Sequence, residues 1–139
     1  MKRFINIFLI AVMSATLMVA CQPDEDDDDP TDPRVDYKGV WSCSEVGGQS
    51  YNVEIEIDSA TQSQIKLFNF HHQGFEEKVN AIVAGTSLTI NSQTMCNGTL
   101  TVDGVATMQS NKTTINFDYT VNNGVDLDTI QAVYTKQSS

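Results

Sequence analysis

The sequence predicts an all-β fold, an antiparallel eight-strand up-and-down meander that closes into a small barrel. From residue 37 onward, β-branched and aromatic residues dominate, turn-forming Gly, Asn, Asp and Ser punctuate them, and proline is absent. Apolar and polar residues alternate along residues 51–58 and 115–121, which is typical of strands with one buried and one hydrated face. The segments between strands are too short for crossover connections, so consecutive strands are expected to pair.

A turn signal separates each expected strand from the next. The strands cover, in chain order, residues 38–46, 50–58, 64–71, 75–84, 86–92, 98–109, 112–121 and 127–136. The turns between them are Gly47-Gly48, Ser59–Gln62, Gln73-Gly74, Gly85, Asn97-Gly98, Ser110-Asn111 and Asn122–Gly124. Closure into a barrel would remove the exposed strand edges, whereas a two-sheet β-sandwich is the alternative. Gly104 would allow a bend or bulge within the sixth strand.

The side chains expected to face the interior are bulky. They are Tyr51, Val53, Ile55, Ile57, Ile65, Leu67, Leu88, Ile90, Leu100, Val102, Phe117, Tyr119, Ile130 and Tyr134. A barrel of this size is just wide enough for side chains to fill it or for one small ligand to enter. A filled interior is therefore favoured, with any binding site at the open rim or on an outer face.

Composition divides the chain into three regions. Residues 1–20 begin with two basic residues and continue as an apolar stretch, which is typical of a secretory signal peptide. A retained transmembrane helix is the alternative, although a span needs about 20 apolar residues. Residues 21–36 carry eight acids and one arginine and are expected to form an acidic disordered tether, and residues 37–139 the barrel domain. The net charge of −10 excludes a basic nucleic-acid-binding surface.

The segment Met18-Val19-Ala20-Cys21 resembles the lipobox of bacterial lipoproteins, although Met18 departs from the preferred leucine. The resemblance implies cleavage after Ala20 and attachment of fatty acyl chains such as palmitate at Cys21, which would anchor the chain in a membrane. Six consecutive acids at residues 24–29 resemble the export signal of Bacteroidetes-type surface lipoproteins. This implies a location at the bacterial outer membrane, facing the cell exterior. Calcium binding and plain solvation are the alternative interpretations of the acidic run.

Gly39 and Trp41 resemble the Gly-x-Trp signature that opens the first strand of lipocalins and related calycin barrels. The resemblance implies that Trp41, the single tryptophan of the chain, packs across the base of the barrel. The domain is shorter than a standard lipocalin, so the resemblance favours the architecture more than a deep ligand cavity. An ordinary core aromatic residue at position 41 is the alternative.

Two cysteines, Cys43 and Cys96, are left once Cys21 is assigned to lipid attachment. Outside the cytoplasm such a pair is more often a disulfide than a metal site. Cys43 shares a strand face with Trp41, and Cys96 shares one with Leu88 if that strand continues without a bulge. We therefore expect a disulfide, with two unpaired core thiols as the alternative.

No pattern of residues indicates catalysis. His71 and His72 are the only histidines, and on a strand they would point to opposite faces, which makes a poor metal chelate unless they lie in a turn. The alternating carboxylates of residues 54–58 indicate a solvated strand face rather than an acid/base pair. We expect no enzyme activity, no metal and no cofactor.

Two classes of function are consistent with these features. The first is a lipid-anchored binding module of the cell surface, with a small apolar or glycan ligand or an envelope protein as its partner. The second is a structural or accessory subunit of an outer-membrane assembly. Ser59, in an Asp-Ser-Ala tripeptide within an expected turn, resembles an O-glycosylation acceptor of the same bacterial group.

Overall fold

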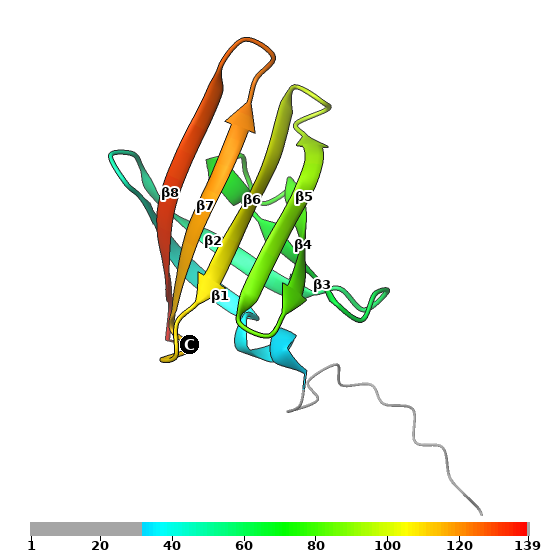
Figure 1. Ribbon diagram of the computed structural model, residues 1–139, viewed down its shortest axis with the longest axis vertical. Coiled ribbons are helices and arrows are strands. Elements are labelled where there is room, and N and C mark those ends of the chain that lie inside the picture. The colour runs from blue at the N-terminus through cyan, green and yellow to red at the C-terminus, as the bar shows by residue number, and fades with distance from the viewer. Residues whose placement is uncertain (1–31, 139) are drawn as a thin grey trace, which may run out of the picture.

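The computed structural model describes residues 32–138, which form a closed antiparallel barrel (Figure 1). Each strand pairs with the next, and the eighth pairs with the first. The strands are β1 (Gly39–Glu45), β2 (Ser50–Ile57), β3 (Gln64–Phe68), β4 (Lys78–Ala84), β5 (Ser87–Met95), β6 (Leu100–Met108), β7 (Thr114–Asn122) and β8 (Leu127–Lys136). The predicted meander is confirmed, and the alternative sandwich is not formed.

Two short 3₁₀ helices mark the two ends of the barrel. The first, η1 (Pro33–Asp36), lies at the end that also holds the β4–β5 and β6–β7 turns; we call this end the base (Figure 1). The second, η2 (Phe70–His72), lies between β3 and β4. This helix and the turn that follows it replace the strand ends expected at residues 69–71 and 75–77. We call this opposite end, toward which the β5–β6 and β7–β8 turns also point, the mouth.

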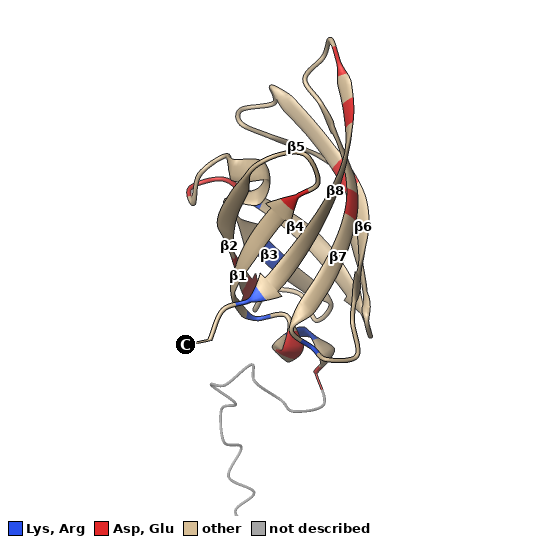
Figure 2. Ribbon diagram, turned by 90° about the vertical axis from the view of Figure 1, so that its left-hand side faces the viewer, with Lys and Arg blue, Asp and Glu red and all other residues tan. Residues whose placement is uncertain are grey.

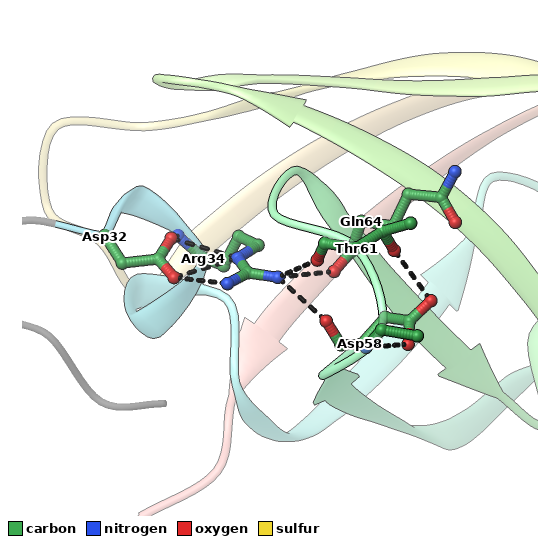
Figure 3. A network of polar contacts seen from close by, with 6 residues as sticks. Asp32, Arg34, Asp58, Thr61 and Gln64 are labelled. Carbon is green, nitrogen blue, oxygen red and sulfur yellow. Dashed lines mark hydrogen bonds and ion pairs between the residues drawn. The ribbon is translucent and has the colours of Figure 1, made fainter. Parts of the chain in front are cut away.

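Arg34 attaches η1 to the base of the barrel (Figure 3). Its guanidinium is almost fully buried and forms an ion pair with Asp32, at 2.7 Å. The same guanidinium donates hydrogen bonds to the main-chain oxygens of Asp58 at 3.0 Å and Thr61 at 2.6 Å, in the β2–β3 turn. Residues 32–36 therefore belong to the folded unit. The boundary expected at residue 37, with a disordered tether before it, was wrong for these five residues, because the single arginine of the acidic stretch finds buried acceptors.

Trp41 lies fully buried next to η1, and its indole Nε1 donates a hydrogen bond to the main-chain oxygen of Tyr37 at 2.7 Å. The ammonium of Lys136 lies 5.3 Å from the centre of the indole ring, within range of a cation–π interaction. Gly39 begins the same strand with φ at +126°, a conformation that residues with a Cβ rarely adopt. These contacts close the base.

Side chains fill the interior along the whole barrel. Of the fourteen predicted interior residues, eleven are buried, whereas Ile57, Leu100 and Ile130 are only partly buried. Phe70 of η2 adds an aromatic plug from outside the strands; it is fully buried and its ring centre lies 4.7 Å from that of Tyr119. Gly104 is needed for close packing, because a Cβ at this position would collide with Tyr119 and lie 2.8 Å from the main-chain oxygen of Asp118.

Candidate functional site at the barrel mouth

A carboxylate lies at the mouth where the barrel interior meets solvent. Glu45, the last residue of β1, keeps only 11% of its side chain exposed. Its Oε1 accepts hydrogen bonds from the hydroxyls of Tyr51 at 2.6 Å and Tyr119 at 2.8 Å, and lies 3.2 Å from Nδ1 of His71. Strands β1, β2 and β7 and helix η2 each contribute one group, so residues far apart in sequence converge on one oxygen atom.

Beside Glu45 lies a small pocket, which we call the mouth pocket. It has a volume of about 140 Å³ and is lined by Glu45, Gln49, Tyr51, His71, His72 and Gln73. The imidazole of His72 stacks on the ring of Tyr51, with centres 5.1 Å apart and planes inclined by 10°. Its Nδ1 lies 2.7 Å from Oε1 of Gln49, which fixes the ring over the β1–β2 turn.

An unusual backbone brings both histidines to the same pocket. Asn69, His71 and His72 adopt φ of +61°, +51° and +57°, all in the left-handed region. Residues on a strand would alternate between faces, which is why we expected the two rings to diverge. The turn alternative was open in that expectation, and the structure takes it. Left-handed residues other than glycine cost free energy and often occur at ligand sites.

Several contacts hold this turn against the barrel. Phe70 fills the interior beneath it, and the side-chain amide of Asn69 donates to the main-chain oxygen of Asn52 at 2.7 Å. Oδ1 of Asn69 accepts from the main-chain nitrogen of Gly74, also at 2.7 Å. Glu77 completes the attachment by accepting a hydrogen bond from the main-chain nitrogen of Cys96 at 3.0 Å. The segment from Asn69 to Glu77 is therefore a turn held against the barrel.

The environment of Glu45 favours its charged form. Burial alone would raise the pKa of this carboxyl, but the hydrogen bonds from Tyr51 and Tyr119 and the attraction of the His71 imidazole outweigh burial and hold the pKa below its usual range. Burial raises the pKa of Tyr51 and of Tyr119, and the negative charge that each hydroxyl contacts raises both further. Glu45 is therefore an anion at neutral pH, bound by two neutral phenols.

A second polar layer lies beneath Glu45, inside the barrel. The hydroxyl of Tyr134 is fully buried and has no hydrogen-bond partner among residues 32–138. The thiol of Cys43 lies close enough to add to the effect of burial in raising the pKa of Tyr134. A thiol is a weak hydrogen-bonding group, so this contact leaves the hydroxyl largely uncompensated.

Cys43 and Cys96 are both free in the structure, so the expected disulfide is not formed. Cys43 points inward as expected and is fully buried, whereas Cys96 lies in the β5–β6 turn. A bulge between Ile90 and Gln93 shifts the strand register, so that Met95 rather than Cys96 takes the interior position. The argument from alternation failed because it required a strand without a bulge.

The remaining predicted residues lie away from the mouth. Ser59 is exposed in the β2–β3 turn at the base, where the carboxylate of Asp58 accepts from the main-chain nitrogen of Ala60 at 3.0 Å. Cys21, like the signal peptide and the acidic run, lies outside the described residues. Sequence reasoning missed Glu45 as a site residue. The signal was present, because Glu45 continues the inward-facing series of positions 41 and 43 with a charged group.

A second depression lies on the outer face of β5–β8. It is shallow, measures about 500 Å³ and includes Asp103, Val105, Asp118 and Thr129 in its lining. The upper parts of β7 and β8 carry acidic but no basic residues (Figure 2). Thr120 donates a hydrogen bond to Asp103 at 2.8 Å, so one of these carboxylates is partly compensated.

Residues 32–138 lack two further features. No group of three or more His, Cys, Asp or Glu side chains in this range is arranged to hold a metal ion. No helix in the same range is long and apolar enough to cross a membrane.

Comparison with known proteins shows the architecture. No protein-family model matches the chain, and no curated protein matches it. Among solved structures, the chain is similar to one described as the structure of a redesigned beta barrel, with a TM-score of 0.52 and 16% sequence identity. The match covers 77% of this chain and 96% of the other. A likeness at this level of identity shows the fold alone, a small antiparallel β-barrel.

Proposed function

We propose that the protein is a lipid-anchored binding module of the bacterial cell surface, without catalytic activity, and that its ligand site is the mouth pocket. The observation that carries the proposal is the charged carboxylate of Glu45 at the edge of a filled interior, next to a pocket open to solvent. The lining of the pocket is mostly polar, and polar groups held in a concave site can orient a ligand and select it. The left-handed turn at His71 and His72 supports the same interpretation.

The position of the chain ends agrees with an anchor at Cys21. The described chain begins at Asp32, at the base, and its last described residues lie at the same end (Figure 1). Eleven residues reach at most about 40 Å when fully extended. A lipid on Cys21 would therefore hold the base nearer to the membrane and leave the mouth free to meet ligands. In this proposal, the resemblance of Gly39 and Trp41 to the lipocalin signature concerns the architecture only.

Ligand-dependent thermal stability tests the proposal. We expect one member of a panel of lipids, glycans, haem and small metabolites to raise the melting temperature of the protein, and Glu45→Gln to remove that rise. Glu56→Gln, which removes one charge from the exposed outer face of β2, is the matched control and should keep it. The proposal fails if no ligand stabilises the protein, or if the rise is the same in both variants. Protease treatment of intact cells tests the location, since a surface protein is cut before lysis.

The acidic depression on β5–β8 favours a second candidate, an accessory subunit of an outer-membrane assembly. Its lining includes Val105, which is 55% exposed, together with the acidic residues Asp103 and Asp118. Protein interfaces commonly combine an apolar centre with a polar rim. Val105→Glu should then abolish co-purification of an envelope protein while leaving ligand binding at the mouth unchanged. Retention of the same partner by this variant would exclude the candidate.

A further inference from the structure

We infer that the mouth pocket binds a small organic cation, a primary ammonium on a short apolar chain, with Glu45 as its counter-ion. The inference rests on the proposed binding function and names its ligand class. It is carried by the hydrogen-bonding capacity that the mouth residues leave unused, by the charge of the pocket and by its size.

The two oxygens of Glu45 have different surroundings. Oε1 accepts from two phenolic hydroxyls and lies within reach of His71. Within residues 32–138, no group donates a hydrogen bond to Oε2. A carboxylate has about four acceptor positions. One oxygen is therefore saturated by the protein, whereas the other, which lies beside Gly48 of the β1–β2 turn, has unused acceptor capacity.

The histidines add further acceptors. Tyr119 uses its proton to bond Glu45, so the contact of 3.0 Å between its hydroxyl and Nδ1 of His71 requires a proton on Nδ1. In the neutral imidazole Nε2 is then an acceptor. The contact between Nδ1 of His72 and Oε1 of Gln49 leads to the same tautomer for His72. The pocket is thus rich in acceptors, whereas an ammonium group is a donor at three positions and an acceptor at none.

Charge and size select among donor ligands. None of the six lining residues is lysine or arginine, so the only lining groups that can carry positive charge are the two histidines, and Nδ1 of His71 lies 3.2 Å from Oε1 of Glu45. With both histidines neutral, the pocket carries one negative charge. An anionic ligand would meet this charge, and an uncharged alcohol would leave it unpaired. The volume of about 140 Å³ is close to the roughly 150 Å³ of a cavity that binds benzene, which admits a short alkyl chain.

Three isosteric probes test the ligand class on the full chain. n-Butylammonium, n-butanol and butyrate have similar shapes and differ in charge, and isothermal titration at neutral pH measures their affinities. We expect n-butylammonium to bind at least about tenfold more tightly than n-butanol, as for hydrogen bonds to charged groups, and butyrate not to bind. Glu45→Gln keeps an acceptor for both tyrosines and should weaken n-butylammonium binding by at least about tenfold. Glu56→Gln should leave the affinity unchanged.

The outcomes separate this inference from the proposed function. Equal binding of n-butanol and n-butylammonium, or n-butylammonium binding that Glu45→Gln does not change, overturns the cation assignment. A glycan or lipid that binds in a manner dependent on Glu45, with no binding of n-butylammonium, also overturns it while supporting a binding site at the mouth. Absence of any Glu45-dependent ligand overturns both.

Discussion

Replacing Phe70 with alanine should destabilise the protein strongly, although Phe70 belongs to a helix of three residues between two strands. Its side chain is fully buried, and its ring contacts those of Tyr119 and Phe117, with centres 4.7 and 6.4 Å away. Loss of a buried phenylalanine costs about 3–5 kcal/mol, and each aromatic pair adds about 0.5–1.5 kcal/mol beyond the buried area. We expect a loss of at least about 4 kcal/mol in the free energy of unfolding.

Urea unfolding followed by tryptophan fluorescence measures this loss, because Trp41 is the single tryptophan and lies in the core. Phe75→Ala is the matched control: Phe75 follows in the same connection but is 53% exposed, and its loss should cost under about 1 kcal/mol. A lower midpoint at an unchanged slope would identify the effect as lost stability. If Phe70→Ala costs no more than Phe75→Ala, η2 does not plug the barrel and our account of the mouth is wrong.

Four other measurements test individual parts of the structure. Gly104→Ala should cost about 1–3 kcal/mol in a urea titration, because the new methyl group would meet the main-chain oxygen of Asp118 at 2.8 Å; an unchanged stability would contradict this close packing. Tyr134→Phe should leave stability unchanged or raise it by about 1 kcal/mol, since the hydroxyl has no partner, and a clear loss would reveal a hydrogen bond. Because the folded pKa of Glu45 lies below its usual range, its stabilising contribution is present above the unfolded pKa and is lost as the pH falls through the folded pKa; acid titration should show a loss of stability that Glu45→Gln reduces. Alkylation with mass spectrometry should find Cys96 modified in the native protein and Cys43 only after unfolding, because burial raises the pKa of the Cys43 thiol to about 11; a disulfide between them would refute this.

The barrel itself was predictable because its signals are local. Alternation of apolar and polar residues is a property of each strand alone, and the turn residues fix where each strand ends. Strands β2 and β8 accordingly lie within one residue of their expected bounds. The register shift in β5 was not predictable in this way. The shift depends on an extra residue in β5 that the alternation of Leu88 and Ile90 does not reveal. In the structure, the side-chain amide of Gln93 forms hydrogen bonds with both main-chain groups of Asn80, at 2.9 and 2.8 Å.

The mouth was less predictable because it depends on contacts between residues distant in sequence. Glu45 and Tyr119 are 74 positions apart, and only the closure of the barrel brings the hydroxyl to the carboxylate. The left-handed backbone at His71 was likewise not predictable, because the residue that adopts it is not a glycine. The buried role of Arg34 was hidden by its neighbours, since an arginine within an acidic stretch is usually solvated.

The plug and the two histidines of the candidate site belong to one short helix, η2, and this would link the proposed ligand binding to the stability of the barrel. Phe70 fills the interior, while the next two residues line the mouth pocket. The turn can keep its left-handed residues only while Phe70 remains buried, because burial of the ring supplies the free energy that offsets their strain. A ligand that bridges Glu45 and the histidines binds this closed arrangement and not the unfolded chain, and therefore adds to its stability. The small core and the site at its mouth are thus coupled through η2, so thermal stability is a direct readout of occupancy.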